Sequence, residues 1–326
     1  MTRYRLLEFI PGVLSWGTIA AVIFASWRLP VAAAIFIILF DIYWLFKTIY
    51  LSLHLRATFQ KMRTNMTINW LDRLSELQLT IDNRQPHWRD IYHLVILPMA
   101  HEPYEVVRES LTAIAAVNYQ KDRFIIVLAR EERIPESAVV TEKIANEFGN
   151  KFFRFLITTH PDGLSGEIRG KGSNETWAAR AARREIIDLA KIPYESILVS
   201  VFDADTQVAP EYFGILTHTF LSTPRPQRSS FQPIPLFTNN IYQAPALARV
   251  IAFSSSFWHM IQQSRPERLT TFSSHAMPFA ALVEVNFWRT SIVSEDSQIF
   301  WQCLLHYDGD WRTVPIFYLV SMDANV

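Results

Sequence analysis

Two long apolar runs open the chain. Residues 9–27 contain no charged side chain, and residues 31–46 contain only one, Asp41. A short turn at 28–30 separates the two runs. An α-helix needs about 20 apolar residues to cross the hydrocarbon core of a bilayer, so each run is close to the length of a membrane span. The pattern predicts a two-helix transmembrane hairpin over residues 1–56.

Two other interpretations of these runs stay open. Arg3 and Arg5 are typical of the basic start of a cleaved signal peptide, although such a peptide is not normally followed at once by a second apolar run. A buried helical hairpin of a soluble protein is the other alternative, although soluble helices of this length rarely lack a polar face. The hairpin through a membrane accounts best for both runs together.

Basic residues lie outside the two apolar runs. Arg3 and Arg5 precede the first run, and the basic residues at or after the end of the second are Lys47, Arg56, Lys61 and Arg63. The turn contains only Arg28. Because Lys and Arg accumulate on the cytoplasmic side of membrane spans, we expect a multi-pass protein of the cell membrane whose later part is cytoplasmic.

The rest of the chain changes from polar helix to alternating elements. Residues 57–90 are polar with a partial apolar stripe at 70–79, which predicts a juxtamembrane helix and a linker. Apolar runs then alternate with helical patterns. Strands are predicted at 91–97, 124–129, 152–158, 196–202 and 315–320, and helices at 105–116, 137–148 and 176–190. This alternation predicts an α/β domain over 91–326, Rossmann-like, with a mostly parallel sheet, flanking helices and a ligand site at the carboxyl ends of the strands.

Composition narrows the function. The chain has 31 basic and 31 acidic residues, so its net charge is zero and we expect no nucleic-acid partner. Half of the residues are hydrophobic, enough for a sizeable core. Cys303 is the only cysteine, which rules out a disulfide within the chain and a site built from several cysteines.

Asp203 and Asp205 carry the strongest local signal. They follow a very apolar predicted strand and are separated by one residue. Two carboxylates at a strand end can bind one hard cation together with phosphate oxygens, so we expect them to hold Mg²⁺ or Mn²⁺. The alternative is a loop pair that only caps the following helix.

Four segments, in this order, resemble the family 2 membrane glycosyltransferases of GT-A type, in particular the cellulose-synthase-like, processive members. The segments are Leu97-Pro98-Met99-Ala100-His101-Glu102, Lys171-Gly172-Ser173-Asn174, Asp203-Ala204-Asp205 and Ser294-Glu295-Asp296. The residues after Asp296, including Gly309, resemble the helix and the glycine that follow in the family. The resemblance covers about residues 91–320 and implies a GT-A domain.

The resemblance also implies roles for these residues in an inverting sugar transfer from a UDP- or GDP-sugar to a lipid or glycan acceptor. Asp296 is the catalytic base and Glu295 orients it or binds the acceptor. Asp205 is the metal ligand, with Asp203 beside it. The residues implied to bind the donor are Pro98, Glu102, Lys171, Asn174 and Asp203. The family's acid after the second strand is replaced here by Glu131 or Glu132, and Glu131 is expected to bind the donor.

Departures from the family pattern keep alternatives open. No Gln-x-x-Arg-Trp motif follows Asp296, and we expect the chain to be truncated at its C-terminus. A GT-A-like domain that is inactive and serves as a binding or assembly subunit is the main alternative, and a nucleotidyltransferase is a weaker one. Glu295 and Asp296 also fit a simple acidic start of a helix. Residues 246–263 predict an amphipathic helix that faces either the membrane surface or, more often for such helices, a core or a partner.

Overall fold

The computed structural model describes residues 3–79 and 86–324 and divides the chain into two compact units, Met1–Leu53 and His54–Val326. Residues 80–85, which belong to the linker predicted over 57–90, lie outside the described residues, as do 1–2 and 325–326.

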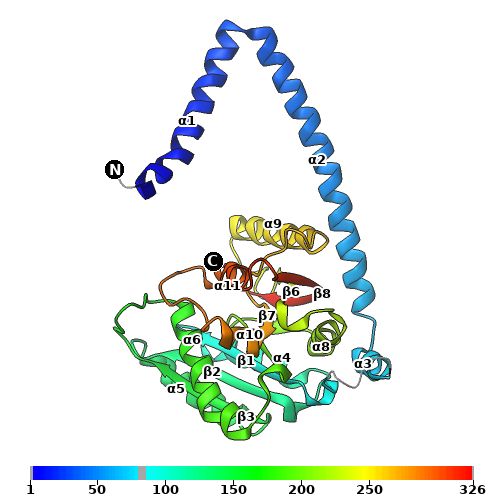
Figure 1. Ribbon diagram of the computed structural model, residues 1–326, viewed down its shortest axis with the longest axis vertical. Coiled ribbons are helices and arrows are strands. Elements are labelled where there is room, and N and C mark those ends of the chain that lie inside the picture. Colours follow the sequence, from blue (N-terminus) through cyan, green and yellow to red (C-terminus); the bar gives the residue numbers. More distant parts are fainter. Residues whose placement is uncertain (1–2, 80–85, 325–326) are drawn as a thin grey trace. The chain divides into compact units, whose positions relative to one another are not determined.

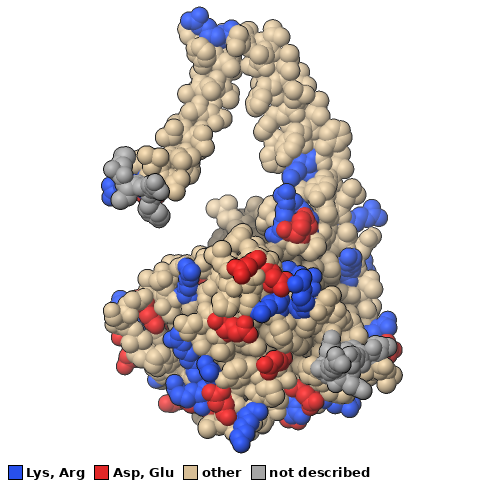
Figure 2. All heavy atoms as spheres, viewed as in Figure 1, with Lys and Arg blue, Asp and Glu red and all other residues tan. Residues whose placement is uncertain are grey.

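The first unit consists of α1 (Arg3–Arg28) and the first part of α2 (Pro30–Asn65). By length and mean hydropathy, 1.7 and 1.9, both helices are suited to cross a membrane. Their large apolar side chains are exposed, Trp16 and Trp27 to 74% each. Figure 2 shows α1 and the upper part of α2 as almost wholly uncharged, with basic atoms at the turn between them and again on the lower part of α2. An exposed apolar surface of this extent is unfavourable in water and favourable in lipid.

The second unit starts with the last turns of α2, followed by α3 (Trp70–Gln78). The Asn69 side chain caps α3 by accepting hydrogen bonds from the backbone N–H groups of Leu71 and Asp72. Trp70 and Leu74 are the buried members of the apolar stripe that predicted this helix. They belong to the main core, so α3 is an integral part of this unit.

Among the described residues, the strands form one sheet with the order β3-β2-β1-β4-β7-β6-β8-β5. The strands are β1 (Tyr92–Met99), β2 (Phe124–Glu131), β3 (Arg154–His160), β4 (Ile197–Val201), β5 (Gln207–Val208), β6 (Ser229–Phe237), β7 (Ala276–Pro278) and β8 (Arg312–Met322). The strands β3, β2, β1 and β4 are parallel to one another. The other half is mixed, with β7 antiparallel to its neighbours and β6 parallel to β8.

Helices cover both faces of the sheet (Figure 1). The remaining helices are α4 (Tyr104–Ala116), α5 (Glu136–Phe148), α6 (Lys171–Ala182), α7 (Asp188–Ala190), α8 (Tyr212–Ser222), α9 (Ala246–Gln263), α10 (Phe279–Glu284) and α11 (Glu295–His306). Successive strand residues enter opposite cores, as Val95 and Ile96 do. One core includes residues of α3, α4, α5 and α8, and the other residues of α6, α10 and α11. This double covering explains the continuous apolar runs of β1, β2 and β4.

The predicted fold class is confirmed: an α/β unit with a parallel half-sheet and flanking helices follows two long apolar helices. Two details differ from the prediction. The helix expected over 176–190 begins earlier, at Lys171, and a π-helical turn, Arg183–Ile187, separates α6 from α7. The strand β6 is an addition, and its pairing with β8 shifts register between Gln232 and Ile234, where Pro233 lacks the N–H of a regular ladder.

Candidate active site

The acidic pair lies where β4 ends. Asp203 and Asp205 follow Val201 directly, and the loop that carries them is fixed from two sides. Asp205 Oδ2 accepts a hydrogen bond of 3.1 Å from the backbone N–H of Asp323, just after β8. The Asn239 side chain donates to the backbone carbonyl of Asp205 at 2.8 Å. After the loop, Gln207 and Val208 form β5, which pairs with β8 in antiparallel orientation. The loop is therefore shaped by residues far along the chain.

Lys171, the first residue of α6, is surrounded by carboxylates. Its Nζ lies 2.8 Å from Asp203 Oδ1 and 3.1 Å from Asp296 Oδ2. Glu175 and Glu295 are slightly farther away, with distances of 3.4 and 3.6 Å from Lys171 Nζ to their Oε1 atoms. Although burial opposes a charged amine, the surrounding carboxylates hold the pKa of Lys171 well above its ordinary value. Lys171 is thus a fixed positive charge at the centre of the site.

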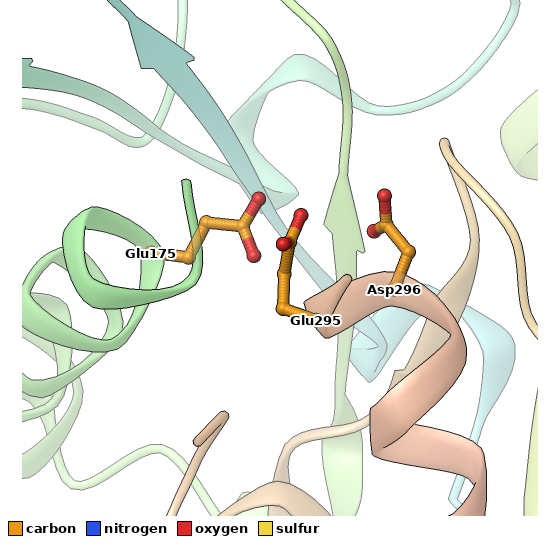
Figure 3. A group of neighbouring side chains, drawn as sticks. All are labelled: Glu175, Glu295 and Asp296. Atoms are coloured by element: carbon orange, nitrogen blue, oxygen red, sulfur yellow. The ribbon is translucent and has the colours of Figure 1, made fainter. Parts of the chain in front are cut away.

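Glu175, Glu295 and Asp296 converge from two helices (Figure 3). Glu175 comes from α6, and the other two start α11. The helices approach closely at Gly172, where an added Cβ would lie 2.9 Å from the Cβ of Glu295. Glycine at this position therefore allows α6 and α11 to bring their carboxylates together.

The environment of these carboxylates favours different protonation states. Burial raises the pKa of Glu175 well above its ordinary value, against the opposing charge of Lys171 and with a smaller contribution from the neighbouring carboxylates. Burial and Asp296 also raise the pKa of Glu295. Burial also raises the pKa of Asp203. The charge of Lys171 and a hydrogen bond from Ser273 Oγ outweigh this effect, so the pKa of Asp203 is lowered overall. Burial and the charge of Asp203 raise the pKa of Asp205 to about 6.

Two places compete as the site of a cation. The convergent set Glu175, Glu295 and Asp296 has enough oxygen atoms, but Lys171 Nζ already lies among them and would repel a second positive charge. Asp205 differs, because no ion pair with Lys171 is formed by its carboxylate, and its buried Oδ1 has no hydrogen-bond partner among the described residues. A free carboxylate oxygen beside Asp203 fits a hard cation such as Mg²⁺ or Mn²⁺. Asp205 is therefore the better-placed ligand for a cation, although Lys171 Nζ also lies 2.8 Å from its neighbour Asp203.

A cavity of about 490 Å³, here called the polar cavity, opens beside the acidic pair. The sequence-predicted residues that line it are Pro98, Glu102, Glu131, Lys171, Asn174, Asp203 and Asp205. Asp296 and Glu295 do not line the cavity. Asp296 is connected to it by its ion pair with Lys171, which does line the cavity. The cavity thus unites the residues predicted to bind the donor and the metal.

The walls of the polar cavity come from the ends of β1 and β2. Glu102 closes the loop after β1 by accepting a hydrogen bond of 2.5 Å from the Ala100 N–H. Glu131, at the end of β2, is buried and lies 3.2 Å from His160 Nδ1. Glu132 is exposed and accepts a hydrogen bond from the backbone of Asp162. Of the two glutamates left open by the sequence, Glu131 is the one that faces the cavity.

Asn174 is held in the same wall. It is buried, and its side-chain amide donates to the Ala129 carbonyl at 2.7 Å. Its Oδ1 has no partner among the described residues. Since buried polar atoms are normally hydrogen-bonded, this acceptor beside the cavity suits a donor group of a ligand.

A strained turn before β7 supplies contacts that the sequence did not predict. Ser274 has a φ of 63°, which is unusual for a residue with a side chain. On one side of it, Ser273 donates to Asp203, and on the other, His275 Nδ1 lies 3.6 Å from Asp296 Oδ1. Burial lowers the pKa of His275 despite the nearby Asp296, which keeps the ring neutral. The turn thus fixes both the acidic pair and the predicted base.

Sequence analysis missed Glu175, Ser273, His275 and Asp323. Only Glu175 had a local signal, because it stands four residues after Lys171 on one helix and can face it. The other three come from segments that matched no pattern, and only the folded chain brings them to the site.

The raised pKa of Glu175 predicts that the stability of the folded protein depends on pH. A carboxyl whose pKa is higher in the folded than in the unfolded protein binds its proton more tightly when folded. Stability therefore falls as pH rises above the ordinary value of 4.5. We expect Glu175→Gln to be increasingly more stable than the wild type between pH 5 and pH 8, measured by urea unfolding in parallel. The exposed Glu142→Gln is the control, and an equal pH trend in wild type and Glu175→Gln would contradict the prediction.

Comparison with known proteins gives structural similarity only. No protein-family model matches the chain, and no curated protein matches its sequence. Among solved structures, the mannosyltransferase PcManGT from Pyrobaculum calidifontis, in complex with GDP-Man and Mn²⁺, is 14% identical with a TM-score of 0.49. The match covers 84% of this chain and 68% of that one. S. aureus TarS 1-349 in complex with UDP-GlcNAc is 13% identical with a TM-score of 0.46, over 72% of this chain and 59% of that one.

A third similar structure is glucosyl-3-phosphoglycerate synthase from Mycobacterium tuberculosis, in complex with Mn²⁺, uridine diphosphate and phosphoglyceric acid. It is 12% identical with a TM-score of 0.44, and the match covers 72% of each chain. With TM-scores below 0.5, a functional proposal has to rest on the site of this chain itself.

Proposed function

We propose that the chain is a membrane-anchored, inverting glycosyltransferase that uses a nucleotide-diphospho-sugar. The observation that carries the proposal is the position of Lys171, which links the acidic pair to the predicted base. Lys171 Nζ lies within 3.1 Å of both Asp203 and Asp296, although these residues are far apart in sequence. A diphosphate leaving group and an attacking hydroxyl need this proximity of a cationic and a basic group.

The polar cavity suits the donor. Arg133 and Lys171 are its basic lining residues, and they complement the diphosphate of a UDP- or GDP-sugar. Asp203 and Asp205 would hold Mg²⁺ or Mn²⁺, which supplies charge stabilisation for the departing diphosphate. Asn174 and Glu131 are placed to bind polar groups of the donor. The donor thus occupies the cavity with its phosphates towards α6.

Asp296 takes the role of the base. In the reaction, the acceptor oxygen forms a bond to the anomeric carbon, the bond from that carbon to the diphosphate oxygen breaks, and the acceptor proton goes to the Asp296 carboxylate. A bound diphosphate gives Lys171 new anionic partners, which frees Asp296 to accept the acceptor hydroxyl. Thr271 Oγ1 donates to the backbone carbonyl of Asp296. Buried Glu295 and neutral His275 lie beside the Asp296 carboxylate. Attack from the face opposite the diphosphate inverts the anomeric centre.

The apolar helices of the first unit support an anchor in the cell membrane. Their length and hydropathy are suited to two spans, and the basic residues around them favour a cytoplasmic catalytic unit. The nucleotide sugar would then reach the enzyme from the cytoplasm.

Donor binding tests the proposal. We expect the detergent-solubilised full chain to bind one of a panel of UDP- and GDP-sugars only with Mn²⁺ or Mg²⁺, measured by calorimetry, and Asp205→Asn to weaken this binding at least tenfold. The control is Asp308→Asn, in the turn after α11. A folded protein that binds no nucleotide sugar with either metal would overturn the proposal. Binding without turnover on any acceptor would instead favour an inactive assembly subunit.

A further inference from the structure

A second cavity of about 560 Å³, here called the apolar cavity, meets the acidic pair from the other side. Asp203, Asp205 and Asp323 line it as well as the polar cavity. Most of its other lining residues are apolar, and they come chiefly from α9 and from β6, β8 and the segment before β7. The apolar ones are Phe237, Pro245, Leu247, Ala248, Ile251, Ala252, Phe272 and Met322. The acidic pair thus separates a polar chamber from an apolar one.

The α9 helix continues this apolar wall outward. Its inner face, with Ala252 and Met260, packs against β6 and is buried. Leu247 and Ile251 line the cavity and are still 73% and 58% exposed. Other large apolar residues of α9 are 48–62% exposed, namely Val250, Phe253, Phe257 and Trp258. An exposed apolar patch of this kind on a folded unit marks a binding surface.

Charge separates the two cavities further. The polar cavity is lined by Arg133 and Lys171, whereas no Lys, Arg or His is among the described residues that line the apolar cavity. Its polar groups are the three shared carboxylates and the hydroxyls of Ser255 and Ser273. One divalent cation on the acidic pair would leave this wall with no excess of positive charge. Because the three carboxylates already balance that cation, an anionic headgroup would meet no uncompensated positive charge there, whereas a neutral hydroxyl has acceptors for its hydrogen bonds.

The segment before β7 connects the wall of the apolar cavity to the start of α11, which carries the proposed base. Thr271 Oγ1 donates a hydrogen bond of 2.5 Å to the Asp296 carbonyl, and the next two residues, Phe272 and Ser273, line the cavity. A hydroxyl at the inner end of the cavity therefore lies in the same neighbourhood as the acidic pair and the start of α11. An acceptor in the apolar cavity would meet a sugar held in the polar cavity at the three carboxylates that line both.

We propose that the apolar cavity is the acceptor site and that it takes a neutral lipid with a free hydroxyl, whose acyl chains lie along Leu247 and Ile251 of α9. This inference rests on the proposed function. That function allows a lipid or a glycan as the acceptor, and the inference restricts the acceptor to neutral lipids with a free hydroxyl. A glycan chain would be held by polar side chains and exposed rings, which are scarce in this lining, and a lipid phosphate would need basic ones. The two apolar helices of the chain are consistent with access to lipid.

The test uses the full chain in detergent micelles, dioctanoylglycerol as the acceptor, and the variant Leu247→Asn/Ile251→Asn. Both residues are exposed, so the change is compatible with folding. We expect the variant to transfer sugar to dioctanoylglycerol at least tenfold more slowly at a subsaturating lipid concentration, with donor affinity unchanged. The matched control, Val250→Asn, changes an exposed residue of the same helix that does not line the cavity, and it is expected to behave as the wild type.

Several results would overturn the inference. One is equal transfer by the double variant and the wild type, and another is an equal loss in Val250→Asn, which would indicate general membrane contact. Transfer by the wild type only to soluble oligosaccharides, or only to a polyprenyl phosphate, would assign a different acceptor class.

A binding readout separates this inference from the proposed function. A photoreactive diacylglycerol should label the wild type within residues 245–252, and the double variant should lose this labelling. Labelling without any donor binding would support the lipid site and contradict the glycosyltransferase. Donor turnover without labelling would support the glycosyltransferase and contradict the lipid site.

Discussion

Replacing Asp296 by Asn is expected to lower the turnover number for sugar transfer by about 10²- to 10⁴-fold, the usual contribution of a positioned general base. Asn has nearly the same shape and still offers an oxygen to Lys171 Nζ, now 3.1 Å from Asp296 Oδ2, but it cannot accept the proton of an acceptor hydroxyl. Donor affinity should change little, because Asp296 does not line the polar cavity. The measurement is single-turnover transfer together with calorimetric binding of the donor.

The control for this variant is Asp310→Asn, which removes an exposed carboxylate paired with Arg225. Its turnover should match the wild type. A loss of less than tenfold in Asp296→Asn would remove Asp296 from the role of base. Glu295→Gln would then be the next variant to measure, since Glu295 is the adjacent buried carboxyl.

Lys171→Met is expected to be the most disruptive change for stability and for donor binding. Lys171 Nζ lies within 3.6 Å of four carboxylates, and its side chain is only 23% exposed. Removing one partner from a buried ionic cluster typically destabilises a protein by about 3–5 kcal/mol, because the opposite charges stay buried. Chemical unfolding should show a loss of this order, and donor affinity should fall because a phosphate partner is missing.

A matched control and a partial rescue sharpen this prediction. Lys151→Met removes an exposed lysine outside the site and should leave stability within about 0.5 kcal/mol of the wild type. Adding Glu175→Gln to Lys171→Met removes one of the carboxyls left without its counter-ion, so the double variant should unfold at a higher urea concentration than Lys171→Met alone. An unchanged stability of Lys171→Met would show that the cluster does not depend on its central charge.

The parallel half of the sheet could be predicted from the sequence because its strands are buried on both faces. The apolar runs at 91–97, 124–129 and 196–202 therefore stand out, and each lies on an observed strand. The strand β6 has no such signal, because Pro233 and Pro235 are unfavourable in a central strand. Its place depends on β8 and β7, which pair with it across long stretches of sequence.

The candidate site was predictable to a similar extent. Residues in short motifs, such as Lys171, Asn174 and Asp203, lie together around one cavity. The motif order gave no indication that Lys171 would reach Asp296, since that contact depends on the close approach of α6 and α11 at Gly172. Single residues such as Ser273 and His275 carry no pattern at all, and their roles follow from the turn at Ser274 alone. Local signals thus predict which residues gather, and tertiary packing decides what they touch.

The bond from the Asp323 N–H to Asp205 Oδ2 spans 118 positions of the sequence. A ribosome adds about 5–20 residues per second, so roughly 6–24 s separate the synthesis of these two partners. During that interval the parallel strands and the helices between them have already been made, whereas the loop of the acidic pair still lacks β8. A nascent chain therefore completes the loop of its proposed cation site only after β8 has been made, later than the parallel strands.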